Sequence, residues 1–543
     1  MKQPIDLFAI ASEAMLKAGF TLDPPDEAPT RPQAKPLVKD LRDRLWSSID
    51  DATTRDLDQV EYAEKLENDD IRVWIGIADV DVYVAKHSAI DTYAAQNCTS
   101  VYTGVKTFPM LPETLSTDLT SLVEGGDRHV VITELIVCPD GDVKSVDIFC
   151  ALINNKAKLA YDEIGAWLEG KSDVPASVSQ VTGMQSQIEL QAEASARLAK
   201  FRKKKGAIEL GTIQAVPVMS ADGRVVALKV IEPNRARDLI SNFMIAANVA
   251  MAEFLEDRGG PSLRRVVRSP EQWDRIVEIA GEHGVKLPTT PHSFALAEFL
   301  DQRKQADPLH FPDLSLAVVK SLGPGEYDVQ APGEEAPGHF GLAVDDYTHS
   351  TAPNRRFTDL VTQRLVKAAM TCTSVKQEPT SNRYLSLNQL AGQEGRLAPA
   401  LEPYNSDQPT EEAHNPHQFA GREGGLAPAP SNASELLEGR SPYSVDELRD
   451  IAARCSEREG AARKVERKMR KVAAALLLQD KIGEEFDGIV TGVTAKGTFA
   501  RLLKPPVDGR ITRGERGLRV GDKTRLRLIS TDPKRGFIDF AKT

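Results

Sequence analysis

Four aspartates stand within nine positions near the start of this 543-residue chain, in the segment SIDDATTRDLDQVEY at residues 48–62. Carboxylates held so close together repel one another and raise one another's pKa. A fold that gathers them must therefore supply a compensating positive charge. A divalent cation is one such charge, because Mg²⁺ prefers hard oxygen ligands and keeps several waters, which suits phosphate chemistry.

The aspartate spacing leaves two interpretations open. If residues 55–59 are extended, Asp56 and Asp58 project to one side, about 7 Å apart, and Asp50 returns to them across a short turn. Such a group can seat one or two ions that polarise a phosphodiester, orient a water and stabilise the leaving oxygen. The alternative is an acidic surface loop, although the spacing does not match the EF-hand calcium pattern.

The composition is that of a soluble globular protein, with 41% hydrophobic and 27% charged residues. No run of about 18 apolar residues occurs, so no membrane span is predicted. The first 20 residues mix charges into an apolar pattern, which indicates an amphipathic helix rather than a signal peptide. The five cysteines are far apart and form no CxxC pair, so we expect reduced thiols in a cytoplasmic protein.

Changes in composition divide the chain into five segments. Residues 1–39 are expected to form a helical segment followed by a linker rich in proline and acidic residues. Residues 40–372 form the main domain, and residues 373–442, poor in aliphatic side chains, are expected to be a disordered insertion. Residues 443–480 are charged and helical. Residues 481–543 alternate in short strands, which predicts a small five-stranded β-barrel.

Local patterns also predict individual elements. Strands are expected where β-branched and apolar residues cluster, and helices where capping residues and stop signals frame an apolar face. The predicted strands are 71–82, 130–137, 145–152, 207–210 and 214–219. The predicted helices are 189–204, stopped by Gly206, and a buried helix from the cap Asn234 to Leu255. A long charged helix or helix pair is expected from a Ser444–Glu447 capping box to about Leu478.

The predicted insertion contains a short duplication. Residues 388–400 read NQLAGQEGRLAPA and residues 417–429 read HQFAGREGGLAPA. Two copies of this length are too few and too polar to build a solenoid. The pair is either part of an expanded linker or a tandem motif that binds partner proteins, and the sequence leaves both interpretations open.

The net charge of −11 does not exclude a polyanionic ligand, because local patches rather than the total decide binding. Basic residues gather in several places. These are residues 202–205, 355–356, 463–471 and much of the last 50 residues.

Seven short motifs, in one order along the chain, resemble those of the RNB (ribonuclease II) family. The aspartate segment resembles the family's signature of Ile-Asp followed by Asp-x-Asp-Asp. The others are IADV at 77–80, FPMLP at 108–112 with Leu-Ser at 115–116, KGAI at 205–208, FMIAAN at 243–248, YTHSTAPNRRFTDL at 347–360, and the helix segments 455–459 and 465–467. Residues 483–541 also resemble the S1 RNA-binding domain that ends these enzymes.

The resemblance implies an α+β fold: an RNB catalytic domain with a mixed β-sheet core surrounded by helices, followed by an all-β OB-fold barrel of the S1 type. It implies a monomeric, processive 3′→5′ exoribonuclease that hydrolyses single-stranded RNA to nucleoside 5′-monophosphates and leaves a short oligonucleotide. The short bacterial type is expected, because the cold-shock domains that usually precede RNB find no counterpart in the first 40 residues. The alternative is a catalytically impaired RNA-binding protein that keeps the fold.

The resemblance also implies roles for individual residues. Asp50, Asp56 and Asp58 match the catalytic carboxylates that bind one or two Mg²⁺ ions, with Mn²⁺ as an alternative. Arg355 matches the catalytic arginine, whose planar guanidinium can grip a phosphate with two hydrogen bonds. The family's fourth aspartate falls at Gln59, whose neutral oxygen is expected to bind metal more weakly.

Five further residues are expected to contact RNA. Tyr102 matches the tyrosine that stacks on the last nucleotides and sets the length of the final product; such stacking is worth about 1–3 kcal/mol per base. Glu466 matches a helix glutamate that governs product release and RNA grip. Arg356 is a second phosphate contact, and Lys205 and Phe499 are expected to hold the strand from a basic cluster and from the barrel.

Overall fold

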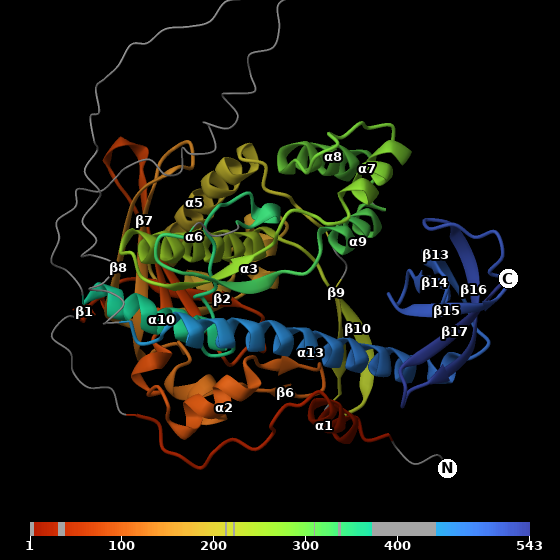
Figure 1. Cartoon of the computed structure of the whole chain (residues 1–543), viewed down its shortest axis with the longest axis horizontal. Helices are drawn as coiled ribbons and strands as arrows, with labels where there is room; N and C mark the ends of the chain where they lie inside the picture. The colour runs from red at the N-terminus through yellow and green to blue at the C-terminus, as the bar shows by residue number, and fades with distance from the viewer. Residues whose placement is uncertain are drawn as a thin grey trace, which may run out of the picture.

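A computed structural model describes residues 5–30, 38–211, 214–220, 223–308, 310–334, 338–371 and 441–543. The predicted insertion and its duplication lie almost wholly outside these ranges. Figure 1 shows the arrangement of the elements. In chain order they are α1 (Leu7–Lys17), β1 (Lys39–Asp40), β2 (Trp46–Asp50), β3 (Gln59–Lys65), β4 (Ile71–Ala78), α2 (Ala89–Asn97), β5 (Val101–Tyr102), β6 (Thr107–Phe108), β7 (Asp127–Val137), β8 (Val143–Ala160), α3 (Tyr161–Leu168), α4 (Ala176–Ser179), α5 (Met184–Lys204), β9 (Gln214–Met219), β10 (Val225–Ile231), α6 (Arg235–Asp257), β11 (Ser262–Val266), α7 (Trp273–Glu282), α8 (Ser293–Ala306), α9 (Phe311–Leu322), β12 (Glu326–Gln330), α10 (Phe357–Met370), α13 (Val445–Leu477), β13 (Glu485–Thr494), β14 (Gly497–Leu502), β15 (Asp508–Arg513), β16 (Lys523–Asp532) and β17 (Phe537–Lys542).

A mixed six-stranded sheet, in the order β1-β8-β2-β3-β4-β7, forms the centre of the main domain. The long strand β8 pairs with β7 along residues 143–154 and with β2 along residues 155–160. The strands β8, β2, β3, β4 and β7 are therefore paired in a closed ring. β2 runs parallel to β8, whereas β3 and β4 are antiparallel neighbours. The apolar run predicted as a strand to residue 82 ends sooner: β4 stops at Ala78, and Val80–Val82 form a 3₁₀ turn.

Helices cover both faces of this sheet (Figure 1). α3, α5 and α6 share one apolar core with it, while α10 and the first turns of α13 contribute to the core that contains Trp46 and Trp74. Asn234 caps α6 as predicted, because its side chain accepts hydrogen bonds from the first backbone amides of the helix. By length and composition alone α6 could cross a membrane, but 72% of its apolar window is buried inside the protein, as in core helices.

α13 is one 33-residue helix that runs from the main domain to the barrel (Figure 1). It begins at the predicted capping box, in which the Ser444 side chain accepts from the Glu447 amide and the Glu447 carboxylate accepts from the Ser444 amide. Its first turns pack against the core of the sheet, and its middle packs against α1. Its last turn shares an apolar core with the side chains of the barrel. The helix therefore connects all three parts of the molecule.

The C-terminal strands close into a barrel in the order β13-β14-β15-β17-β16. The α+β organisation and the all-β C-terminal domain are thus confirmed. The predicted strand at 207–210 is wrong: these residues form no strand, and Ile208 donates a single backbone hydrogen bond to Gly341. An extended segment without a partner strand along its length forms no ladder.

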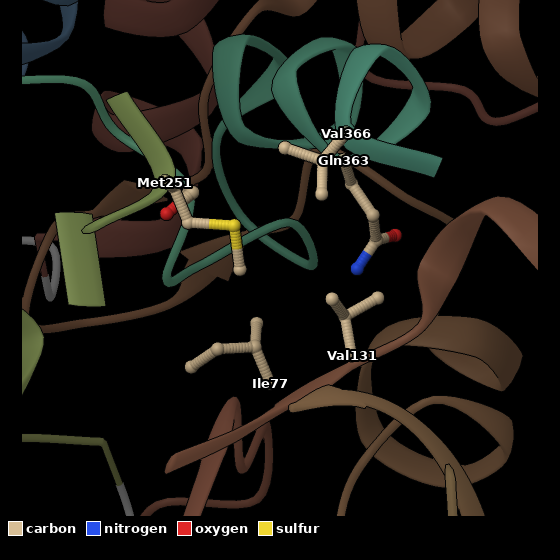
Figure 2. A pocket seen from close by; sticks show the side chains of 6 residues that line it. Ile77, Val131, Met251, Gln363 and Val366 are labelled. Atoms are coloured by element: carbon tan, nitrogen blue, oxygen red, sulfur yellow. The ribbon is translucent and has the colours of Figure 1, made fainter. Parts of the chain in front are cut away.

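A small gap remains in the interior between the sheet and α6 and α10 (Figure 2). Its lining is largely apolar and includes the side chains of Ile77, Val131, Met251 and Val366. It has no room for a water-sized molecule, so we treat it as imperfect packing rather than as a ligand site.

Candidate active site

The predicted carboxylates lie where β2 ends and β3 begins. Asp50 is the last residue of β2, Asp58 directly precedes β3, and Gln59 is its first residue. Because these two strands are antiparallel neighbours, the loop 51–58 returns the chain to its starting point. Asp50 and Asp58 are buried, at 8% and 3% exposure, whereas Asp56 is half-buried on the loop.

Distant basic residues hold this loop in shape. The Nζ of Lys158 donates to the carbonyl of Thr54 at 2.6 Å, and the Nη2 of Arg237 donates to the carboxylate of Asp51 at 2.7 Å. Asp51 is therefore engaged by α6. Sequence reasoning missed Lys158 and Arg237, because a contact between a distant cation and a loop leaves no local pattern to read.

Arg355 reaches the aspartates from 297 residues away in the chain, and its Nε donates to Asp58 Oδ2 at 2.8 Å. Its backbone carbonyl accepts from the amide of Ser100 at 3.0 Å and from Thr99 Oγ1 at 3.3 Å. The Arg355 side chain is 43% exposed, whereas that of Asp58 is 4% exposed. Among the described residues no hydrogen bond occupies its two Nη groups, so the guanidinium is anchored at one edge and open at the other.

Tyr102 connects the loop to α13. Its hydroxyl donates to Asp56 Oδ2 at 2.8 Å, and its backbone amide donates to Glu466 Oε1 at 3.0 Å. The structure thus brings together Asp56, Tyr102 and Glu466, which stand in three separate parts of the sequence. Burial raises the pKa of the Tyr102 hydroxyl, so the group stays protonated as a donor.

Burial also perturbs the two inner carboxyls. It raises the pKa of Asp50 to about 7, with a hydrogen bond from Gln59 opposing it and the charge of Asp58 adding to it. It raises the pKa of Asp58 to about 6, although the charge and hydrogen bond of Arg355 act in the opposite direction. Asp58 is then largely ionised at pH 7 but Asp50 is not, so full ionisation of the pair requires further positive charge nearby.

A divalent cation fits this requirement. Asp50 Oδ2 and Asp58 Oδ1 are buried and have no hydrogen-bond partner. Within the ranges that the structure describes, no three His, Cys, Asp or Glu side chains are grouped closely enough to hold a metal ion by themselves. Mg²⁺, however, is commonly held by one or two carboxylates together with water and substrate phosphate. The residues present fit that mode of binding, whereas the set of three aspartates stays a prediction.

The remaining predicted residues take other positions. The Nε2 of Gln59 donates to Asp50 Oδ1 at 3.3 Å, so its amide acts here as a hydrogen-bond donor. The Nη2 of Arg356 is paired with buried Asp359 at 2.7 Å. Lys205 lies at the C-terminal end of α5 and Phe499 on barrel strand β14, away from the contacts just described. RNA contacts by Arg356, Lys205 and Phe499 stay predictions.

Glu61, two residues along β3 from Gln59, is a buried carboxyl that sequence reasoning missed. Neither of its oxygens has a hydrogen-bond partner in the described part of the chain. Burial and then the charge of Asp50 raise its pKa well above the ordinary value. Nothing in the local sequence marks it as buried, because β3 also carries Gln59, Glu64 and Lys65.

Comparison with known families agrees with this arrangement. Residues 38–371, more than half of the chain, match the RNB domain. The chain belongs to the RNB family. Residues 484–543 match the C-terminal S1 domain of ribonuclease II-type exonucleases. Nucleases of the RNB family generally use Mg²⁺, in keeping with the unpartnered carboxylate oxygens.

Curated relatives of this RNB protein are ribonuclease R enzymes. Ribonuclease R 1 of Lactococcus lactis is 25% identical over 99% of this chain and 61% of its own length. Ribonuclease R of Escherichia coli is 28% identical over 91% of this chain and 52% of its own length. The chain thus spans only about half to three-fifths of the length of these two relatives.

Solved structures share the fold at lower identity. Mycoplasma genitalium RNase R in complex with ribose-methylated single-stranded RNA superposes with a TM-score of 0.77, at 22% identity over 99% of this chain and 78% of that one. Yeast Ssd1, a pseudonuclease, superposes with a TM-score of 0.60, at 14% identity over 96% of this chain and 57% of that one. Because a pseudonuclease shares it, the fold alone does not establish catalysis.

Proposed function

We propose that this RNB protein is a processive, hydrolytic 3′→5′ exoribonuclease that releases nucleoside 5′-monophosphates from single-stranded RNA. The observation that carries the proposal is the hydrogen bond from Arg355 to Asp58. The two Nη groups of Arg355 stay available to a ligand, and Asp58 Oδ1 has no hydrogen-bond partner in the described part of the chain. This pairing places positive charge beside a candidate cation site, which is the arrangement that phosphodiester hydrolysis needs.

The aspartates and Arg355 would have different roles in hydrolysis. Asp50 and Asp58 would hold the cation, and Asp56 and Gln59 are the further ligands that we propose. Mg²⁺, or Mn²⁺ in its place, supplies Lewis-acid polarisation of the phosphate and a more acidic bound water. The open edge of Arg355 would donate to the non-bridging phosphate oxygens, where negative charge develops in the transition state.

The 3′ end of the strand would lie on Tyr102, which is 40% exposed and is held from both sides by Asp56 and Glu466. Stacking on this ring would set the length of the last oligonucleotide, and Glu466 would control product release through its bond to the Tyr102 amide. The barrel would grip the upstream strand. We place the activity in the cytoplasm, in a monomer. Other RNA-decay proteins are candidate partners of the duplicated segment.

Two RNA complexes of a relative support this proposal in outline. Mycoplasma genitalium RNase R has been solved with ribose-methylated single-stranded RNA and with double-stranded RNA. By analogy, RNA is the polymer that this chain would bind.

A second candidate function is RNA binding without catalysis. It is favoured by one observation, the amide of Gln59 at the position of the family's fourth aspartate. The unpartnered oxygens of Asp50 and Asp58, together with Arg355, favour catalysis instead, since a buried carboxylate without a partner is costly and a bound cation would offset that cost.

Incubation of the protein with 5′-labelled poly(A) and Mg²⁺, beside an Asp58→Asn variant, separates the two functions. The wild type is expected to shorten the RNA to an end product of a few nucleotides. The variant is expected to leave it intact, because it loses the carboxylate charge that both the cation and Arg355 contact. Intact RNA that is only retarded on a native gel with the wild type would support binding without catalysis.

Stability should respond to the cation in a pH-dependent way. Between about pH 4 and pH 7 the folded state holds protons on Asp50 and Asp58 that the unfolded chain releases, so without metal their contribution to stability falls as pH rises through this window. Since the cation binds the ionised carboxylates, the rise in Tm on adding Mn²⁺ should be small at about pH 5 and large at about pH 8. Differential scanning calorimetry of the wild type and of an Asp50→Asn/Asp58→Asn double variant checks this. An equal Tm rise in both proteins would contradict it.

A further inference from the structure

The N-terminal helix α1 supports both elements that hold Tyr102. Its buried side chains, which include Leu7 and Met15, share one core with Val101 and Phe108 of the β5–β6 hairpin. The same core contains Val465 and other residues of α13, the helix that carries Glu466. α1 is thus fixed against the hairpin on one side and against α13 on the other, as its position beneath α13 in Figure 1 also shows.

One aromatic side chain of α1 points outward. Phe8 is 48% exposed, and its ring stacks on Phe108 with centroids 6.5 Å apart and an interplanar angle of 18°. The Nζ of Lys106 lies 4.6 Å from the centroid of Phe8 and 5.4 Å from that of Phe108. Lys106 is exposed, and no ion pair with a carboxylate engages it among the residues that the structure describes.

An exposed ring beside an unneutralised ammonium is suited to a nucleotide. Base stacking on an aromatic face tolerates any sequence, and a lysine serves as a point charge for phosphate. Lys106 also lies close to the proposed 3′-end site. It stands in the turn of the hairpin whose first strand ends at Tyr102, and Tyr102 pairs with Thr107, the residue that follows Lys106. A strand whose 3′ end lies on Tyr102 and that leaves along the hairpin would therefore meet Lys106 and then Phe8.

We propose that Phe8 and Lys106 form a second contact for single-stranded RNA, on the 5′ side of the nucleotides held at Tyr102. The inference rests on the proposed function and deepens it. The N-terminal helix then has a role beyond packing, because it lengthens the RNA-binding surface by at least one stacked base. The competing explanation is that Lys106 and Phe8 form a cation–π pair that only stabilises α1.

The test measures RNA affinity in EDTA, where the strand is not degraded. Fluorescence anisotropy would compare labelled RNAs of about 4 and about 20 nucleotides. Phe8→Ala is expected to weaken binding of the longer RNA by roughly tenfold, the loss expected for one stacked base, and to leave the shorter RNA unaffected. Phe8→Trp should retain wild-type affinity. Lys106→Gln should reduce the salt dependence of binding, with a slope smaller by about 0.7.

Leu16→Ala is the matched control, since Leu16 is an apolar residue of the same helix at 60% exposure. It should leave both affinities unchanged, and its Tm should match that of Phe8→Ala. Wild-type affinity of Phe8→Ala for the longer RNA, or an equal loss for both RNAs, overturns the proposal. Failure of the wild type to bind RNA overturns it together with the proposed function. Binding that depends on Phe8 in a protein that does not cleave RNA with Mg²⁺ supports it and overturns only the proposed catalysis.

Discussion

Arg355→Ala is expected to lower kcat for RNA hydrolysis by about a hundredfold to a thousandfold, the usual cost of removing one donor to transition-state charge. The open edge of the guanidinium is the group that would meet the phosphate, so kcat should fall more than KM rises. Steady-state cleavage of a labelled RNA at saturating Mg²⁺ measures both constants. The same substitution removes the charge that lowers the pKa of Asp58. The pH at which activity appears should therefore move upward in the variant.

Two other variants make this result specific. Arg355→Lys keeps the charge but loses the planar fork, so an intermediate loss of kcat is expected. Arg268→Ala is a matched surface control, because Arg268 is exposed and paired with two exposed carboxylates, Glu326 and Asp328. It should cleave at the wild-type rate. An Arg355→Ala protein with wild-type kcat and an unshifted pH profile would remove Arg355 from the proposed mechanism.

Local features of the fold were the most predictable from sequence. The capping box at Ser444 and the cap at Asn234 depend on residues within one helical turn, so their patterns are sufficient. The strand predicted to residue 82 ended early: the Asp79 amide still donates to His129 of β7, but Val80–Val82 then turn away, and the Asp79 carboxylate is bound by Lys367. The partner, Lys367, lies 288 residues away and cannot be found by local reading.

The candidate site was predictable only through family resemblance. Nothing in the local sequence joins Asp58 to Arg355, and the motif order alone suggested that they meet. Resemblance did not reveal the contacts of Lys158 and Arg237 with the aspartate loop, nor the buried carboxyl of Glu61, because these depend on the packing of this particular chain. The aspartate segment by itself was also compatible with an acidic surface loop; in the structure Asp50 and Asp58 are buried, whereas Asp51 is exposed and Asp56 is half-buried.

Arg364→Met is expected to lower the free energy of unfolding by about 3–5 kcal/mol, the cost of removing one partner from a buried ion pair. The Arg364 side chain is 4% exposed and donates to Asp91 at 2.8 Å, to Asp81 at 3.0 Å, to the hydroxyl of Tyr443 at 2.6 Å and to the carbonyl of Val84 at 2.8 Å. It thereby joins α10 to the start of α2 and to the residue that directly precedes the capping box of α13. Urea unfolding followed by circular dichroism measures the loss.

The size of the effect should depend on what remains behind. After Arg364→Met, Asp91 is left buried without its cation, so adding Asp91→Asn should recover part of the stability, and the double variant should lose less than the sum of the two single losses. Arg449→Met removes an exposed pair with Asp446 on α13 and should cost no more than about 0.5 kcal/mol. Strict additivity of the Arg364 and Asp91 losses would mean that the two groups do not act as a pair.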